Sequence, residues 1–345
     1  MERELDLKRK SIAQLAGQIS GGVTALVCAL NGFGVWALVW GAMADTIVRT
    51  IAMNIARPLF IFPDFSMRGM REILSFGGVV TGERVVWFAY NQADIFIIGK
   101  LLDKASLGIY SVAMHLSSLI MHKSGEILYT VAFPAFAKVQ DDLPAVKHYF
   151  LKALRLMSMV VFPVFIGMSA LSTEIITLLL GEKWLSAIPI FAILCLIMPL
   201  RMISNIFAPL LQGIGRPGAS VKNLIVAVIV MPIAFIVGSQ WGISGVGYAW
   251  VVAFPLVLLV MAYQSIGYAN ISILEFCKEM IGPCLIGGLM YAGIVYLENT
   301  LYSDFNSMIR LIFGVMTGAT IYFVLAYLFL RSELIEIYTL VRPKK

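Results

Sequence analysis

The sequence predicts an all-α polytopic membrane protein with about ten transmembrane helices. Of its 345 residues, 60% are hydrophobic and only 13% are charged, and the mean hydropathy is +0.88. Soluble domains contain about a quarter charged residues, so this composition excludes an ordinary soluble protein. The four cysteines stand singly in or beside apolar runs, without the spacing of a zinc site. We therefore expect no metal and no cofactor.

Long stretches without Asp, Glu, Lys or Arg locate the helices in order. Residues 11–44 and 223–274 contain none over 34 and 52 positions, and a span needs about 20 residues, so each stretch turns at least once. Asn31-Gly32 and the glycines within 239–245 mark these turns. The expected helices are 12–30, 34–56, 74–100, 105–131, 150–171, 186–210, 219–239, 243–264, 279–297 and 308–330.

The basic residues predict the orientation of these helices. With the N-terminus inside, 17 of the 26 Lys and Arg residues fall on the cytoplasmic side, and only Lys100, Lys104, Lys183 and Arg310 fall on the outer side. We therefore expect a multi-pass protein of the cytoplasmic (inner) membrane with both termini in the cytoplasm. Basic cytoplasmic loops explain the net charge of +6 more simply than nucleic-acid binding does, and no nucleic-acid partner is expected.

Two predicted outer turns resemble each other. NGFGVWALVW at 31–40 and WGISGVGYAW at 241–250 both place Gly-Val before a small residue and a Trp. The second turn closes a group of six predicted helices, whereas the first closes a group of two. In a protein built from two parallel six-helix repeats, four helices would precede this chain, so we expect an N-terminally truncated sequence. The alternative is that glycines at tight helical hairpins recur by chance.

Six stretches carry a resemblance to a known family. In order they are GFGVWALV, ILSFGG, NQADIFIIGKLLDKASLGIYSVA, VAFPAFAKVQDD, LLGEKWLSAIPIFAIL and LLQGIGRP, between residues 32 and 217. With them the chain resembles the polysaccharide transporter family of Wzx-like lipid-linked oligosaccharide flippases, within the multidrug/oligosaccharidyl-lipid/polysaccharide flippase superfamily. The nearest subgroup serves exported polysaccharides such as colanic or teichuronic acids.

The resemblance implies a two-lobe flippase fold in which the N-lobe is incomplete. Residues 1–66 would be the last two helices of the N-lobe, 67–265 the six-helix C-lobe, and 266–345 an extra C-terminal helix pair with a cytoplasmic tail. The implied function is to flip lipid-linked oligosaccharide or polysaccharide repeat units across the cytoplasmic membrane by alternating access. The implied partners are an undecaprenyl-diphosphate-linked oligosaccharide, membrane lipids, and a polymerase with its export machinery.

Three other functions stay open. A drug or cation antiporter of the same superfamily would favour a carboxylate-rich cavity, and the excess of cations at membrane depth argues against it. A membrane-embedded polysaccharide polymerase or acyltransferase would need large loops or a cluster of His, Asp and Arg, and the loops here are short. No catalytic residues are therefore expected. A non-functional fragment is the third alternative.

Basic residues within the predicted spans are candidate substrate contacts. A charge at the bilayer centre costs about 2.5–3.5 kcal/mol on insertion scales, so such side chains normally face protein or a water-filled cavity. Arg84, Lys123 and Arg201 lie on three predicted helices at a similar depth on the cytoplasmic side. An anionic lipid headgroup would need such a set, and Arg can bind phosphate oxygens through two hydrogen bonds. These three residues are the predicted substrate-binding residues.

The acidic residues at membrane depth are Asp94, Glu126 and Glu83, which we predict to be ion-coupling or cavity-polar residues. For Asp94 the functional reading is a carboxylate linked to protons or sodium. The structural alternative is a buried acid that is hydrogen-bonded across helices.

Pairing within single helices is the structural alternative for several other charges. Lys123 and Glu126 are three residues apart, and Asp45 and Arg49 are four apart, so each pair lies on one helix face. Arg155 lies near a predicted cytoplasmic helix end, where its long side chain is expected to reach the aqueous interface.

Overall fold

The computed structural model of the chain describes residues 7–56, 70–301 and 305–331. Within these ranges, the residues described by their backbone alone are 7–10, 56, 70–80, 82–84 and 122–131. The regular structure of the described residues is helical throughout. Two compact units are formed, residues 1–74 and 75–345, and each is considered by itself. The three-part division drawn from the sequence stays a prediction.

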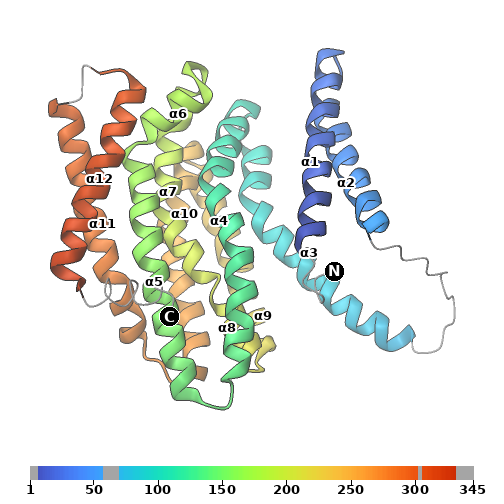
Figure 1. Cartoon of the computed structure of the whole chain (residues 1–345), viewed down its shortest axis with the longest axis vertical. Helices are drawn as coiled ribbons and strands as arrows, with labels where there is room; N and C mark the ends of the chain where they lie inside the picture. Colours follow the sequence, from blue (N-terminus) through green and yellow to red (C-terminus); the bar gives the residue numbers. More distant parts are fainter. Residues whose placement is uncertain (1–6, 57–69, 302–304, 332–345) are drawn as a thin grey trace. The chain divides into compact units, whose positions relative to one another are not determined.

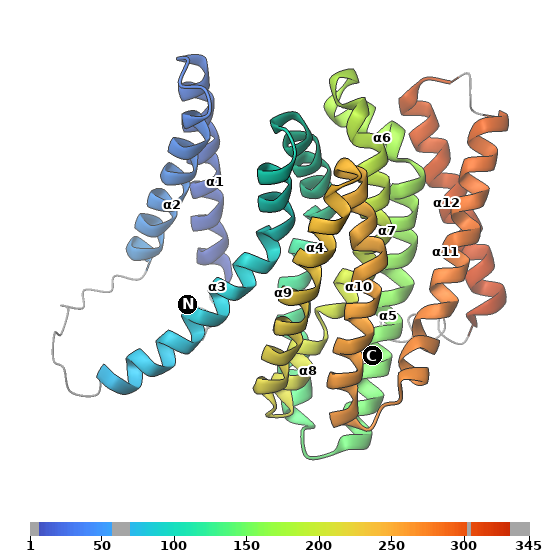
Figure 2. The ribbon, with the colours of Figure 1, turned by 180° about the vertical axis from the view of Figure 1, so that it is seen from behind.

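The first unit is a helical hairpin of α1 (Leu7–Leu30) and α2 (Trp36–Ala56), which lie side by side in Figures 1 and 2. The predicted turn at 31–35 is present, with Gly32 and Gly34 at φ 79° and 54°. Small residues line the contact between the helices: a Cβ added to Gly21 would lie 2.9 Å from the carbonyl oxygen of Gly41. Glycine is therefore what allows these two backbones to approach.

The sequence leaves open a pairing of Asp45 with Arg49 along α2, and the described part of the structure does not contain it. The described residues contain no ion pair between them, although both lie on α2. Asp45 instead packs against Gly17 of α1, and its Oδ1 is buried without a hydrogen-bond partner. The close approach of the two helices at Gly17 directs the carboxylate across the hairpin rather than along α2.

The second unit is a bundle whose long helices run mostly antiparallel to the preceding long helix, with α8 continuing the path of α7 (Figure 1). Two 3₁₀ turns, η2 (Glu182–Ala187) and η3 (Gly267–Ala269), interrupt the chain. The α-helices are α3 (Met70–Leu101), α4 (Lys104–Lys138), α5 (Leu143–Ala170), α6 (Ser172–Leu180), α7 (Ile188–Ser204), α8 (Phe207–Gly213), α9 (Pro217–Ser239), α10 (Gly242–Ile266), α11 (Ile273–Leu301) and α12 (Ser307–Phe329).

Seven helical segments of the described residues are long and apolar enough to cross a membrane: 11–30, 143–170, 182–213, 217–239, 242–269, 273–301 and 307–329. Each of the ten helices expected from the sequence has a helical counterpart. The predicted class, an all-α multi-pass membrane protein, is confirmed, and the count of ten spans is approximate.

Several helices begin earlier than the sequence pattern predicted, and the difference is largest for α5. α5 starts at Leu143, where residues up to 149 were expected to form a loop. The Asp142 carboxylate accepts a hydrogen bond from the amide of Ala145 at 3.1 Å, and Pro144 occupies the first turn. An aspartate cap followed by proline starts a helix even where the sequence is polar, because the carboxylate accepts from an unpaired amide of the first turn and proline has no amide hydrogen to satisfy there.

α7 lies at the centre of the second unit, packed against α4, α5 and α10. Most of its circumference is buried, and Leu196 lies on the side that remains exposed. α11 packs on α5 at one edge of the unit, and α12 packs on α11 (Figure 2).

Two ion pairs fasten α11 to α5. The guanidinium of Arg155 donates two hydrogen bonds to Glu279, at 2.6 and 2.9 Å, and Lys147 lies 2.7 Å from Glu275. Arg155 was expected to extend toward the aqueous interface. It instead pairs with a carboxylate of the neighbouring helix. The two parallel hydrogen bonds of this bidentate pair strengthen the attraction between the charges and fix its geometry.

Candidate functional site

The predicted helix 186–210 is interrupted at residues 205–206, between α7 and α8. Pro209 has no amide hydrogen to donate to the carbonyl of Asn205, so the regular helix cannot continue there. The amides of Asn205 and Ile206 instead close tighter turns three residues back, each at 3.1 Å. The interruption places Arg201, in the last turn of α7, beside a cavity of the second unit.

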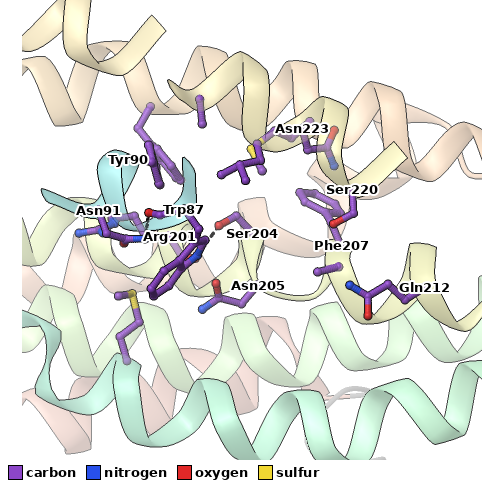
Figure 3. Close-up of a pocket in the computed structure, with 16 residues that line it drawn as sticks. Trp87, Tyr90, Asn91, Arg201, Ser204, Asn205, Phe207, Gln212, Ser220 and Asn223 are labelled. Atoms are coloured by element: carbon purple, nitrogen blue, oxygen red, sulfur yellow. Dashed lines mark hydrogen bonds between the residues drawn. The ribbon is translucent and has the colours of Figure 1, made fainter. Parts of the chain in front are cut away.

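This cavity has a volume of about 530 Å³ and lies among α3, α4 and α7–α10 (Figure 3). Its only charged lining residue within the described part of the chain is Arg201. Amide and hydroxyl side chains of the lining include Asn91, Ser204, Asn205, Gln212, Ser220 and Asn223, and most of the remaining lining is aromatic or aliphatic. We call this cavity the Arg201 pocket.

Arg201 is 8% exposed and its guanidinium carbon lies 4.2 Å from the ring centroid of Trp250. Its Nη1 also donates to the sulfur of Met114 at 3.5 Å. No carboxylate of the described residues lies within ion-pair distance of it. Cation–π stacking stabilises a desolvated guanidinium by about 2 kcal/mol, which leaves much of its burial cost unmatched. Arginine has five N–H donors, so an anion entering the pocket can still be bound.

A hydrogen-bond chain holds Trp250 in place under Arg201. Asp94, which is 2% exposed, accepts from the hydroxyl of Tyr110 at 2.6 Å and from the amide of Ile95 at 2.8 Å. The Tyr110 oxygen in turn accepts from Nε1 of Trp250 at 2.9 Å. Asp94 therefore orients the edge of the indole whose face supports Arg201.

Two of the six predicted site residues are thus brought to the same indole ring, although they lie 107 positions apart in the sequence. Arg201 contacts its face, and Asp94 reaches its edge through Tyr110. The side chains of the other four, Arg84, Lys123, Glu83 and Glu126, lie outside the described residues. Their assignments stay predictions.

Tyr110, Trp250 and Asn223 were not among the predicted site residues. For Trp250 a signal existed: it lies inside the predicted span 243–264, away from the membrane interfaces that usually satisfy an indole N–H. A tryptophan at that depth needs an acceptor inside the protein. The residue that supplies this acceptor, Tyr110, is determined by how α3, α4, α7 and α10 pack together, which the sequence pattern does not show.

A second charged cluster lies away from the pocket, where α6 meets α11 and α12. Arg310 of α12 contacts Glu298 of α11 and lies 3.0 Å from Glu174 of α6, which is 1% exposed. Burial, together with a hydrogen bond to Glu298, raises the pKa of Glu174 to about 7. The positive charge of Arg310 opposes this rise. One arginine here is shared by two carboxyl groups.

Together, the fold and the Arg201 pocket define a multi-pass helical membrane protein with a cation-bearing polar cavity inside one bundle. A family model described as "Polysaccharide biosynthesis protein" matches residues 1–189, which is more than half of the chain, and the chain belongs to this family. The resemblance to polysaccharide transporters drawn from the sequence is confirmed.

Curated relatives match over most of the chain. It is 29% identical to the teichuronic acid biosynthesis protein TuaB of Bacillus subtilis, over 79% of this chain and 55% of that protein. It is 24% identical to a probable low-salt glycan biosynthesis flippase, Agl15 of Haloferax volcanii, over 87% of this chain and 63% of that protein. The chain therefore spans between about half and two thirds of the length of these relatives.

Among solved structures, the chain is similar to the lipid II flippase MurJ in its inward closed conformation. The TM-score is 0.70 at 16% sequence identity, over 92% of this chain and 67% of that one. At this identity the likeness shows the fold, and it confirms the flippase fold that the sequence predicted.

Proposed function

We propose that this protein translocates lipid-linked oligosaccharide or polysaccharide repeat units across the cytoplasmic membrane in cell-surface polysaccharide biosynthesis. The observation that carries this proposal is Arg201, a buried cation with no carboxylate of the described residues within ion-pair distance, in a pocket whose other described lining side chains are uncharged. Within a polysaccharide biosynthesis family, an anionic carrier lipid is the ligand that such a cation fits. Arginine can bind two oxygens of a diphosphate at once.

In this proposal the diphosphate of an undecaprenyl carrier binds at Arg201, and the bound group changes sides of the membrane by alternating access. Movement of a ligand needs no covalent chemistry, and the protein is proposed to be a transporter and not an enzyme. The interruption between α7 and α8 supports a site here, because broken helices at cavities are common in transporters. Further candidates for binding the headgroup are Arg84 and Lys123.

Asp94 is the proposed ion-coupling residue, with Glu126 and Glu83 as further candidates. Its two oxygens accept from Tyr110 and from a backbone amide, so adding a proton or sodium ion to it would disturb the bond to Tyr110. Tyr110 holds Trp250, and Trp250 supports Arg201. Ion binding at Asp94 would thereby change the position of Arg201, the residue proposed to bind the substrate.

The membrane orientation proposed is the one predicted from the sequence, with both chain termini cytoplasmic. The support for it is the excess of Lys and Arg on the side assigned to the cytoplasm; Lys104 and Lys138, which the prediction assigns to opposite sides, are at opposite ends of α4. The domain division proposed is 1–66, 67–265 and 266–345.

The test is a translocation assay with the 345-residue chain in proteoliposomes. A radiolabelled oligosaccharide on undecaprenyl diphosphate is followed by its protection from a glycosidase that cannot cross the membrane. We expect loss of protection at least about tenfold faster than in protein-free vesicles, and a return to the protein-free rate in Arg201→Ala. Lys183→Ala, an exposed basic residue outside the pocket, is the matched control. A wild-type rate equal to that of protein-free vesicles would contradict the proposal.

A further inference from the structure

Asn223, on α9, is a buried amide whose orientation the structure fixes. Its Nδ2 donates to the hydroxyl oxygen of Ser265 at 2.7 Å, and that hydroxyl donates to the carbonyl of Met261 at 2.6 Å. Ser265 has one hydroxyl proton and uses it on Met261, so toward Asn223 its oxygen can only accept. The amide therefore presents its NH₂ group to Ser265, and its oxygen faces elsewhere.

The oxygen of Asn223 is left without a donor. The residue is 2% exposed and lines the Arg201 pocket, and its Oδ1 has no hydrogen-bond partner among the described residues. Buried acceptors of this kind are rare, because an unpaired polar atom costs folding free energy. A diphosphate or carboxylate has only acceptor oxygens at neutral pH and cannot pair with it. A hydroxyl group can.

The opposite wall of the pocket is aromatic and accessible. Trp87 and Tyr90 of α3 line the pocket, and the side chain of Trp87 is 55% exposed (Figure 3). Asn91 follows them on the same helix, and because its Nδ2 donates to the carbonyl of Trp87 at 2.9 Å, its own oxygen stays an acceptor. An exposed indole beside amide oxygens offers a flat apolar surface edged with acceptors.

These features match the two sides of a sugar ring. The C–H groups on one face of a pyranose pack on an indole, and the hydroxyl groups around its rim donate to amide oxygens. An anion can use Arg201 and the neutral N–H and O–H donors of the lining, whereas only a hydroxyl-bearing ligand can also pair with the oxygen of Asn223. A drug-like cation would instead need a carboxylate, and the described lining contains none.

We propose that the Arg201 pocket is a glycan subsite, in which a sugar ring stacks on Trp87 and donates a hydroxyl hydrogen bond to Oδ1 of Asn223. This inference rests on the proposed function and deepens it. Arg201 binds the diphosphate of the carrier, and the uncharged part of the pocket recognises the first sugar attached to that diphosphate. Trp87 and Asn223 are then specificity-determining residues for the same transport.

The experiment measures the affinity of the full chain in detergent micelles by native mass spectrometry. The probes are undecaprenyl diphosphate alone, the same carrier with one glucose, and the same carrier with one N-acetylglucosamine. For the wild type we expect at least one glycosylated carrier to bind about tenfold more tightly than the bare carrier. Trp87→Ala should remove this preference and leave binding of the bare carrier within about twofold, and Trp87→Phe should keep most of it.

Two further variants make the test independent of one side chain. Asn223→Leu should also remove the preference, with its melting temperature recorded to show that it folds. Trp241→Ala removes a tryptophan that is also exposed but lies outside the pocket, and it should change nothing.

Each contrary result has a separate meaning. Equal binding of bare and glycosylated carriers to the wild type would overturn the glycan subsite and leave the diphosphate site of the proposed function standing. A preference that survives in both Trp87→Ala and Asn223→Leu would place the sugar elsewhere and overturn the inference. Failure of all three carriers to bind would overturn the proposed function as well.

Discussion

Arg201 and Arg310 are two arginines of the same helical unit in opposite electrostatic settings. Arg310 lies between the carboxyl groups of Glu174 and Glu298. Arg201 is more deeply buried, yet it stacks on Trp250, and no carboxylate of the described residues lies within ion-pair distance of it; the charge of Asp94 acts on it only from farther away. A charge that its own protein neutralises holds helices together, whereas a buried charge without such a partner is available to a ligand.

The two settings also differ in what surrounds the charge. Around Arg310 the neighbouring groups belong to three helices that it joins, α6, α11 and α12. Around Arg201 the neighbours are the Trp250 ring, the Met114 sulfur and the uncharged polar and apolar lining of a cavity of about 530 Å³. The first arrangement predicts effects on stability when it is altered, and the second predicts effects on binding.

The largest expected effect is on ligand binding at Arg201. Arg201→Ala should weaken binding of undecaprenyl diphosphate about 100-fold, because charge-assisted hydrogen bonds to the diphosphate are lost, at about 1.5–3 kcal/mol. Arg201→Lys should lose about tenfold, since an ammonium cannot bind two oxygens in a fixed plane. Native mass spectrometry measures both, and normal abundance in the membrane is the control. Wild-type affinity in Arg201→Ala would contradict the assignment.

The next effect is on stability at Arg310. Arg310→Ala should reduce the free energy of unfolding by about 2 kcal/mol, because it removes hydrogen bonds to two carboxyl groups, one of which is buried. Ligand affinity should stay at the wild-type value. Thermal unfolding in detergent measures the first, and Glu174→Gln in the same chain should restore part of the loss. An unchanged melting temperature would show that the cluster does not hold these helices.

A smaller effect concerns pH. The pKa of Glu174 is about 7 in the folded protein, above the ordinary value of 4.5, so the folded state prefers this carboxyl group protonated. Its contribution to stability is fully present below about pH 4.5 and is lost as the pH rises through about 7.

Glu174→Gln should therefore raise the melting temperature by a few degrees at pH 8 and change it little at pH 5. Thermal scans of both proteins at the two pH values measure this difference. A gain that is the same at pH 5 and pH 8 would show that Glu174 does not titrate in this range.

The smallest effect is expected at the ion pair of Lys147 with Glu275, whose side chains are each more than 30% exposed. Lys147→Ala should cost less than about 1 kcal/mol, and the cost should fall as salt is added. A loss of several kcal/mol would mean that the contact between α5 and α11 depends on this pair.

The sequence predicts the helices of this protein well because each membrane span is a continuous apolar stretch, which can be recognised from neighbouring residues alone. It also singles out Arg201 and Asp94, since charges at membrane depth are costly and rare. It does not predict that both reach Trp250, because that contact requires α3, α4, α7 and α10 to meet.

Asn223 shows the same limit. Its sequence context is the beginning of an apolar span, where an amide is unremarkable. Its importance follows from a pairing with Ser265, 42 positions later, which leaves its oxygen without a donor. Hydrogen bonds between distant segments carry no local signal, so residues of this kind become visible only in the folded structure.

The most direct test gives Arg201 a neighbouring carboxylate, as Arg310 already has. Ser204 lies three residues after Arg201 and also lines the pocket, so Ser204→Asp places a carboxylate within reach of the guanidinium. The account predicts that undecaprenyl diphosphate binds this variant at least about tenfold more weakly than the wild type, while the uncharged Ser204→Asn binds normally. Equal affinity of both variants for the carrier would contradict the claim that the charge of Arg201 is kept for an anionic ligand.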